Sequence, residues 1–428
     1  MELKKLVEWN PWWEKPELIE RLRGRPRPDY ARLLGSIVSK EITVITGVRR
    51  SGKSTLMYQM VGRLLNNGAD PKSIFFVNLE DKKLARDSLD DIYDCYRAGM
   101  NPDGKAHIFL DEVHKKEGWE SWIRKKYDTK TDDKFIISGS CSYLLKREYS
   151  TLLTGRNLTF EVFPLSFREF LMFKGIEVDY AKLRKGVVLD RTRFLAIKHL
   201  GEYLDLGGFP AVLSEDEHYK QVLLEQYFDD ILYKDVIDRY NLNSQKTRDL
   251  ALFLATNFTG QASLRNIRTS LGLSYDTTRD YLSCFKEAFM FFTLDHFSYS
   301  FKEQKTLPSK VYCIDNGLRN AVSFRFSKEE GHLAENIVFV ELKRRDEDIY
   351  YWKGKNEVDF VVKNRDSSLT AINVHYTDEI AGRETQGLLE FKGKFKRTGE
   401  LLLLTKDIEK SEGGIRFMPL WKWLLEAK

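Results

Sequence analysis

The sequence predicts an α/β protein that starts with a parallel β-sheet flanked by helices and continues into helical and further α/β parts. Three observations predict this fold class. Short β-branched runs alternate with helical stretches between residues 41 and 171. A glycine-rich turn follows the first of these runs, and the pattern becomes helical after Phe167. With about 150 residues per domain, a chain of 428 residues is also expected to divide into several domains.

The predicted parallel sheet has five strands, at residues 42–45, 74–78, 107–110, 135–137 and 158–163. We assign residues 1–165 to an N-terminal arm and this core, and residues 166–245 to a helical lid or linker. Residues 246–325 follow as helices at 250–257, 264–271 and 275–288 and strands at 289–294 and 310–314, which is the order of a winged helix-turn-helix. Residues 326–428 form a compact α/β domain with a helix at 332–344 and strands near 350, 358–362, 371–374 and 401–404.

Charge nearly cancels over the whole chain, because 69 Lys and Arg stand against 64 Asp and Glu. Nucleic-acid binding therefore has to be argued from local patches. One patch alternates arginine with Gly24, Pro26 and Pro28, so it is an irregular arm that either contacts phosphate or lies in solvent. Its arginines are Arg21, Arg23, Arg25 and Arg27.

The sequence predicts a cytoplasmic protein that does not enter a membrane. No stretch reaches the ~18 apolar residues of a membrane span, and the tryptophan-rich N-terminus lacks the apolar region of a signal peptide. The four cysteines lack the close spacing of zinc sites or disulfide frameworks, so we interpret them as reduced core residues. They are Cys95, Cys141, Cys284 and Cys313.

A phosphate-binding loop lies between the first strand and a helix-forming stretch. Residues 47–54 fit the pattern G-x-x-x-x-G-K-[ST], in which backbone N–H groups close around phosphate at a helix N-terminus. Lys53 is expected to reach the β- and γ-phosphates of ATP, and Ser54 to coordinate Mg²⁺. The predicted ATP contacts are Gly47, Arg49, Arg50, Ser51, Gly52, Lys53, Ser54 and Thr55.

Two carboxylates complete the predicted nucleotide site. The apolar strand at 107–110 ends in Asp111 and Glu112. Asp111 is expected to hold Mg²⁺ with Ser54, and Glu112 to orient and deprotonate the attacking water. The next strand leaves the sheet with the hydroxyls of Ser138 and Ser140, either of which could sense the γ-phosphate, although ordinary turn chemistry also selects serine there.

Together these segments resemble a known family. The carrying residues are 47–55, 110–114, 138–143, 154–156, the segment Phe163-Pro164-Leu165-Ser166-Phe167-Arg168-Glu169-Phe170, and Gly207-Gly208-Phe209-Pro210. They look like the prokaryotic AAA ATPase family common in archaea, whose members carry a C-terminal restriction-endonuclease-like domain. The resemblance implies a cytoplasmic ATPase that forms a ring or other homo-oligomer and works on DNA. It also implies that Arg156 is an arginine finger that reaches a neighbour's γ-phosphate.

The same resemblance implies a second metal site in the C-terminal domain. In PD-(D/E)xK nucleases a helix supplies a Glu, one strand an Asp and the next Glu-x-Lys. Glu335 matches the helix position, and Glu357 and Asp359 match the first strand. The next strand has Asn373 and His375, which depart from the pattern and put autonomous cleavage in doubt.

The remaining expectation concerns what the protein acts on. The recognition-like helix carries Tyr275, Thr277, Thr278 and Arg279 at its N-terminal end, where helix-turn-helix proteins contact DNA. Winged helices also serve as lids or packing modules. Three functions stay open: a DNA-dependent ATPase that remodels, translocates or recognises branched DNA, a signalling ATPase that switches a protein-interaction surface, and an ATP-gated structure-specific nuclease.

Overall fold

The computed structural model describes residues 1–129, 132–141, 155–262, 264–323, 329–377, 379 and 382–426. The chain divides into two compact units, Met1–Val162 and Phe163–Lys428. The boundary lies three residues before the expected end of the core at 165. The segments that the sequence assigns to the lid, the winged helix-turn-helix and the C-terminal domain all lie in the second unit.

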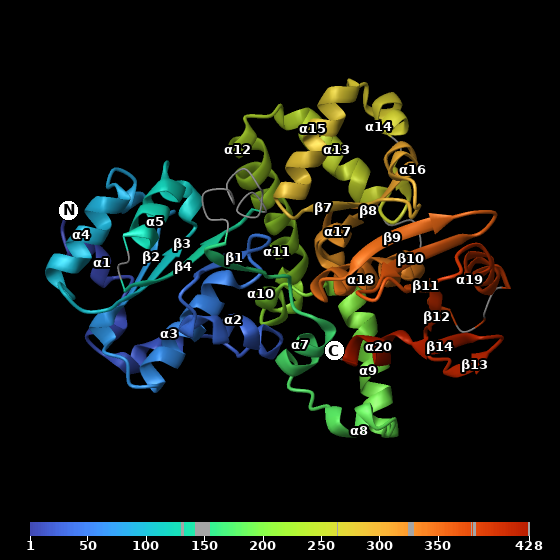
Figure 1. Ribbon diagram of the computed structural model, residues 1–428, viewed down its shortest axis with the longest axis horizontal. Coiled ribbons are helices and arrows are strands. Elements are labelled where there is room, and N and C mark those ends of the chain that lie inside the picture. Colours follow the sequence, from blue (N-terminus) through green and yellow to red (C-terminus); the bar gives the residue numbers. More distant parts are fainter. Residues whose placement is uncertain are drawn as a thin grey trace. The chain divides into compact units, whose positions relative to one another are not determined.

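The first unit contains the predicted parallel sheet, with strand order β2-β3-β4-β1-β5 (Figure 1). Every neighbouring pair is parallel. The strands are β1 (Ile42–Thr46), β2 (Ile74–Asn78), β3 (His107–Asp111), β4 (Lys134–Gly139) and β5 (Asn157–Glu161). Because β4 lies between β1 and β3, the carboxyl ends of these two strands lie on either side of it. The α/β fold and the five-stranded sheet predicted from the sequence are confirmed.

Helices cover both faces of this sheet. Phe75 and Phe76 are successive residues of β2, so their side chains point to opposite faces. Phe76 stacks on Tyr58 of α3 (Lys53–Asn66), and Phe75 stacks on Tyr96 of α4 (Leu89–Gly99), each with ring centroids 4.5 Å apart. On the α4 side, α5 (Trp119–Asp128) packs next to it through Trp122 and Tyr93.

The N-terminal segment covers the exposed edge of β2. It contains α1 (Lys4–Val7), the 3-10 turns Pro11–Trp13 and Pro16–Arg21, and α2 (Ala31–Gly35). The amide of Asn10 donates to the carbonyl of Phe76 at 2.8 Å and accepts from its N–H at 2.7 Å. The indole N–H groups of Trp12 and Trp13 donate to the carbonyl of Ile74. The segment therefore satisfies backbone groups that an edge strand would otherwise leave open to other chains.

The second unit begins with helices, as the sequence predicts. They are α7 (Phe167–Phe173), α8 (Tyr180–Arg184), α9 (Asp190–Leu206), α10 (Pro210–Leu213), α11 (Glu217–Asp230), the π-helical Ile231–Ile237 and α12 (Asp238–Tyr240).

Glycine is required where α9 ends. A Cβ on Gly207, whose φ is +69°, would lie 2.0 Å from Oδ1 of Asp315, and one on Gly208 would lie 2.4 Å from the carbonyl of Leu165. The Gly-Gly-Phe-Pro segment is therefore a close-packing site.

Two sheets complete the second unit. The smaller has order β6-β8-β7 and is antiparallel, and the larger has order β13-β14-β12-β11-β10-β9. Around the smaller sheet lie α13 (Ser244–Thr256), β6 (Gln261–Ala262), α14 (Leu264–Leu271), α15 (Tyr275–Glu287), β7 (Phe291–Leu294), α16 (Phe301–Thr306), β8 (Ser309–Cys313) and α17 (Asn316–Val322). The larger part contains α18 (Glu330–Arg344), β9 (Asp348–Lys353), β10 (Glu357–Lys363), β11 (Leu369–His375), α19 (Gly382–Lys394), β12 (Thr398–Thr405), β13 (Lys410–Glu412), β14 (Ile415–Pro419) and α20 (Leu420–Leu425).

The structure bears on two further expectations from the sequence, the burial of the cysteines and the absence of a membrane span. Cys141 and Cys313 are buried as expected of core residues, whereas Cys95 and Cys284 are only half-buried. Within the described part of the chain, no helix is both long and apolar enough to cross a membrane.

Candidate nucleotide-binding site

The backbone of the phosphate-binding loop needs its two glycines. Gly47 follows β1 with φ +148°, and a Cβ there would lie 2.1 Å from the carbonyl of Val162. Gly52 has φ +98° and stands directly before α3. L side chains rarely adopt such backbone conformations, so glycine allows the chain to turn tightly from strand to helix. The loop therefore presents the N-terminus of α3 at the carboxyl end of the sheet, where anions bind.

The loop side chains fit a phosphate ligand. The ammonium of Lys53 is buried and donates to the carbonyls of Gly47 at 3.0 Å and Val48 at 3.1 Å. The hydroxyl of Ser51 is buried and has no hydrogen-bond partner among the described residues. A buried polar atom left without a partner is a position where a ligand oxygen or water is expected. We therefore expect Lys53 to exchange its carbonyl contacts for phosphate oxygens when ATP binds.

Asp111 lies at the centre of a hydrogen-bond network at the end of β3. It accepts from the hydroxyl of Ser54 at 2.6 Å, from the amide of Asn78 at 3.2 Å, and from the hydroxyl of Ser138. Burial, and next to it the charge of Glu112, raises the pKa of Asp111 to about 6, while the hydrogen bonds from Ser138 and Ser54 act in the opposite direction. A bound cation would favour the ionised form of this carboxylate. Together with the Ser54 hydroxyl it offers the oxygen ligands that Mg²⁺ prefers.

Glu112 is held in an unusual backbone conformation next to this network. Its φ is +54°, in the left-handed region that few non-glycine residues adopt. Its N–H donates to the hydroxyl of Ser138 at 3.2 Å, and its carboxylate accepts from the N–H of Ser140 at 3.3 Å. Strained residues of this kind gather at functional sites, where the surrounding structure fixes them. The network holds one carboxylate at the metal position and the next beside it.

Ser138 orients the two acids directly. Its hydroxyl is buried and contacts both the carboxylate of Asp111 and the N–H of Glu112. These contacts give Ser138 a positioning role, and sensing of the γ-phosphate by Ser138 or Ser140 stays a prediction.

The other predicted loop contacts differ in their surroundings. The guanidinium of Arg49 is paired with the carboxylate of Glu80 through two nitrogens, at 3.3 and 3.2 Å. Arg50 is exposed and has φ +69°, and Thr55 lies half-buried in the first turn of α3. A phosphate contact from Arg49 would therefore compete with its pairing to Glu80.

One arginine of the N-terminal arm belongs to the site, although the sequence placed the arm only near phosphate or in solvent. Arg27 is 2% exposed, and its guanidinium donates to the carbonyl of Ser51 at 2.7 Å. The carbonyl of Ser51 and the N–H of Gly52 belong to one trans peptide and point in opposite directions. Arg27 therefore fixes the direction of an N–H group at the start of α3.

Replacing Arg27 with methionine is expected to weaken ATP binding roughly 10- to 100-fold, because a hydrogen bond from a charged group contributes about 1.5–3 kcal/mol. Equilibrium titration with a fluorescent ATP analogue measures this. Arg25→Met is the matched control, since Arg25 lies on the same arm and is exposed. Equal ATP affinities of the two variants would show that Arg27 does not contribute to ATP binding.

Arg156 lies directly before β5 in the same unit. Its Nε is 3.0 Å from Oδ1 of Asp128 at the end of α5, and its side chain is 31% exposed. Of the segments that carry the family resemblance, residue 154 of 154–156 and residues 142–143 of 138–143 lie outside the described residues.

Comparison with known proteins agrees with this geometry. Residues 39–171 match the family described as AAA domain, and residues 197–329 and 330–423 match two families described as domains of unknown function, DUF8612 and DUF4143. The protein named "Uncharacterized protein MJ1544" from Methanocaldococcus jannaschii is 31% identical over 413 residues, covering 91% of this chain and 89% of the relative. A protein from Haemophilus influenzae is 30% identical over 396 residues, covering 90% and 94%.

The chain belongs to the family of these two proteins. Its first unit is a P-loop domain of the AAA type. Among solved structures, AMPPCP-bound DnaA from Aquifex aeolicus is similar to this chain, with 13% sequence identity and a TM-score of 0.26. The similarity covers 60% of this chain and 86% of the DnaA chain. A DNA replication initiation factor has 13% identity and a TM-score of 0.23, and covers 63% of this chain and 87% of that chain.

Outside the AAA domain, the three carboxylates of the predicted second metal site do come together. Glu335 lies on α18, and Glu357 and Asp359 lie on β10. The ammonium of Lys310 stands between them and contacts all three. Among the described residues, no group of three or more His, Cys, Asp and Glu side chains has the arrangement of a metal site. The geometry thus gives the predicted metal no support, because a lysine holds the position that it would need.

The predicted DNA contacts on α15 are only partly exposed. Tyr275 is 49% exposed, and Thr277 is half-buried. Thr278 is fully buried and donates its hydroxyl to the carbonyl of Ser274, so its assignment as a DNA contact is wrong. The guanidinium of Arg279 is exposed and lies 3.4 Å from Asp276 and 3.5 Å from Asp280.

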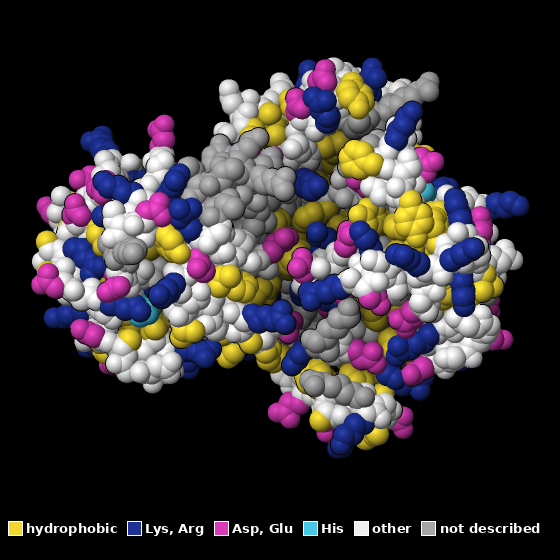
Figure 2. Space-filling model, viewed as in Figure 1, with side chains coloured by type: hydrophobic (Ala, Val, Ile, Leu, Met, Phe, Trp, Pro, Cys, Tyr) yellow, Lys and Arg dark blue, Asp and Glu magenta, His cyan; other side chains and the backbone are white. Residues whose placement is uncertain are grey.

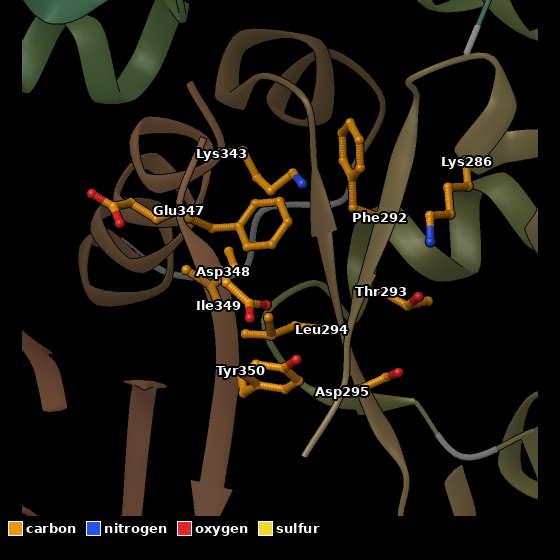
Figure 3. A pocket seen from close by; sticks show the side chains of 11 residues that line it. Lys286, Phe292, Thr293, Leu294, Asp295, Lys343, Glu347, Asp348, Ile349 and Tyr350 are labelled. Carbon is orange, nitrogen blue, oxygen red and sulfur yellow. The ribbon is translucent and has the colours of Figure 1, made fainter. Parts of the chain in front are cut away.

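A cavity of about 190 Å³ lies in the second unit between the edges of its two sheets. Figure 3 shows its walls formed by Phe292, Thr293 and Leu294 of β7 and by Asp348, Ile349 and Tyr350 of β9. None of the site residues predicted from the sequence lines it.

Proposed function

We propose that the protein binds ATP with Mg²⁺ in its AAA domain and hydrolyses it there, and that it uses this reaction to act on DNA as a homo-oligomer. One observation carries the proposal of hydrolysis. The Ser54 hydroxyl at the start of α3 donates to the Asp111 carboxylate at 2.6 Å, and Glu112 follows immediately in the chain. The phosphate-binding loop, the metal ligands and a candidate base are thus joined by one network.

The residues divide the work in this scheme. Lys53 and the backbone N–H groups of the loop bind and orient the phosphates, and Ser54 with Asp111 would hold Mg²⁺. When bound, the metal neutralises charge on the β- and γ-phosphates. Glu112 orients the attacking water and takes its proton, and the N–H of Ser140 keeps that carboxylate in place.

The proposal of DNA action rests on the second unit. Helices α13, α14 and α15 and strands β6, β7 and β8 follow one another in the order of a winged helix-turn-helix, interrupted by α16. The start of α15 exposes the ring of Tyr275 and the guanidinium of Arg279. An aromatic ring and an arginine at this position suit contact with bases and phosphates.

A second candidate is an ATPase whose nucleotide state switches a protein-interaction surface. Asp276 and Asp280 lie on either side of Arg279, so these three residues at the start of α15 carry two negative charges and one positive charge. On the face seen in Figure 2, Lys and Arg side chains of the described residues are mixed with Asp and Glu and form no continuous stripe. A mixed surface suits a protein partner better than a DNA backbone.

Steady-state ATPase measurements separate the two candidates. The rate is measured without nucleic acid and then with single-stranded, duplex and four-way DNA at stated salt concentrations. DNA action predicts stimulation that falls as salt rises, because phosphate contacts release counterions. Arg279→Ala is expected to lower this stimulation without changing the basal rate, whereas Lys363→Ala, at an exposed position on β10, leaves both unchanged. A rate that no DNA alters would favour the switch.

A further inference from the structure

The second unit contains a buried lysine surrounded by three carboxylates. Lys310 lies on β8, and its side chain is 3% exposed. Its Nζ is 2.6 Å from Oε1 of Glu357, 2.8 Å from Oε1 of Glu335 and 3.3 Å from Oδ1 of Asp359. An ammonium carries three N–H donors, so the three oxygens match its capacity.

These carboxylates have other partners as well. The hydroxyl of Tyr312 donates to Glu335 at 2.8 Å, and the N–H of Val374 donates to Asp359 at 2.9 Å. The ammonium of Lys353 lies 3.5 Å from Oε2 of Glu357 at the surface. Glu357 and Asp359 therefore use one oxygen for Lys310 and the other for a second partner, whereas Oε1 of Glu335 accepts from both Tyr312 and Lys310.

The cluster lies where the two sheets of this unit meet. Lys310 belongs to the smaller sheet, and Glu357 and Asp359 belong to β10 of the larger one. Backbone hydrogen bonds cross the same seam, from Tyr351 N–H to the carbonyl of Asp295 at 3.1 Å and from Phe297 N–H to the carbonyl of Tyr351 at 2.6 Å. The lysine thus contacts side chains from elements that are far apart in the sequence.

A cation stabilises three carboxylates that lie this close together. Buried charges are stable only when paired, and removing one partner leaves the others uncompensated. Carboxylate clusters commonly solve this with a divalent ion held by oxygen ligands. Here Asn373 stands nearby in place of a further acid, and its carbonyl oxygen accepts from the N–H of Asp359 at 3.1 Å. Lys310 is therefore the one ammonium that contacts all three carboxylates among the described residues, and Lys353 lies near Glu357 alone.

We propose that Lys310 is the built-in cation of this cluster, taking the place of a divalent metal and fastening β8 to α18 and β10. The cluster then requires no metal to be stable. It also lacks the metal-bound water that hydrolytic chemistry at such a site would use. The inference is independent of the proposed ATP hydrolysis, because its residues lie in the other unit.

The test compares the nucleotide-free full chain with Lys310→Met and Lys353→Met. Without divalent ions, Lys310→Met is expected to lower the Tm of the second unit by on the order of 10 °C, because three carboxylates lose their common partner. Lys353→Met removes an exposed lysine beside the same Glu357, and its Tm is expected to stay within about 3 °C of the wild-type value. Equal falls in both variants would contradict the proposal.

Mn²⁺ then tests whether a metal can replace the lysine. At constant ionic strength, Mn²⁺ is expected to raise the Tm of Lys310→Met and to leave the Tm of the second unit unchanged in the wild type. Asp359→Asn in the Lys310→Met background should remove this recovery, which excludes Mn²⁺ bound at Asp111 as its source. A wild-type response to Mn²⁺ that Asp359→Asn abolishes would show that metal displaces the lysine, and would overturn the proposal.

A charge-relief variant covers the case in which Lys310→Met does not fold. Lys310→Met with Glu335→Gln leaves one unpaired carboxylate fewer, so it is expected to unfold at a higher temperature than Lys310→Met, or to fold where the single variant does not. A double variant that is less stable than the single one would show that charge compensation is not the role of Lys310.

Discussion

Glu112→Gln is expected to slow ATP hydrolysis by about 10²- to 10⁴-fold while ATP stays bound, because the amide cannot accept the proton of the attacking water. The substitution keeps the size of the side chain. Its amide oxygen can still accept from the N–H of Ser140, as the carboxylate does at 3.3 Å. Turnover and nucleotide affinity, measured on the same preparation, should therefore separate, and the protein should accumulate with ATP bound.

Glu117→Gln is the matched control for this prediction. Glu117 is an exposed carboxylate five residues further along the chain. Its conversion to an amide changes the net charge by the same amount, so a general charge effect would appear in both variants. A wild-type rate in Glu112→Gln would assign water activation to another group.

If Arg156 completes the site of a neighbouring subunit, Arg156→Ala is expected to lower the rate of ATP hydrolysis roughly 10³- to 10⁵-fold without loss of ATP affinity. In this structure its guanidinium pairs with Asp128, and both side chains are partly exposed. Ion pairs at the surface contribute only about 0–1 kcal/mol, so the pairing is readily exchanged for a phosphate. Hydrolysis rate and nucleotide affinity of the assembled protein measure the effect.

Two controls distinguish a finger from a local ion pair. Asp128→Ala removes the same pair from the other side, and it is expected to leave turnover near the wild-type rate. Mixing Arg156→Ala with Lys53→Ala subunits should restore part of the activity, because one mixed interface joins an intact pocket to an intact finger. A fully active monomer would exclude the finger, and a loss in Asp128→Ala as large as in Arg156→Ala would assign the effect to local structure.

The core of the nucleotide site could be predicted from the sequence because it depends on patterns of residues that lie close together in the chain. Strand, glycine turn and helix follow one another within residues 42–66, and Asp111 and Glu112 directly end a strand. The carboxyl ends of parallel strands meet at one edge of the sheet, so strand alternation already places these residues together. The contact between Ser54 and Asp111 agrees with that expectation.

Sequence reasoning failed where burial decides a residue's role. Thr278 looked like a groove contact because it stands near the start of a helix. It shares a helix face with Tyr281 and Phe285, which are also buried, and this spacing of three and four residues was a signal available in the sequence. Arg27 had no such signal, because its neighbours Gly24, Pro26 and Pro28 indicate only an irregular arm.

By itself the sequence determined the parallel sheet, the phosphate-binding loop and the two acids at the end of β3, since each depends on residues close together in the chain. Only the tertiary structure decided that Arg27 reaches the carbonyl of Ser51 and that Lys310 stands among Glu335, Glu357 and Asp359. The physical reason is distance along the chain. A buried charge is stable only beside its partners, and which partners it meets depends on how separate elements pack, which the pattern within one element does not contain.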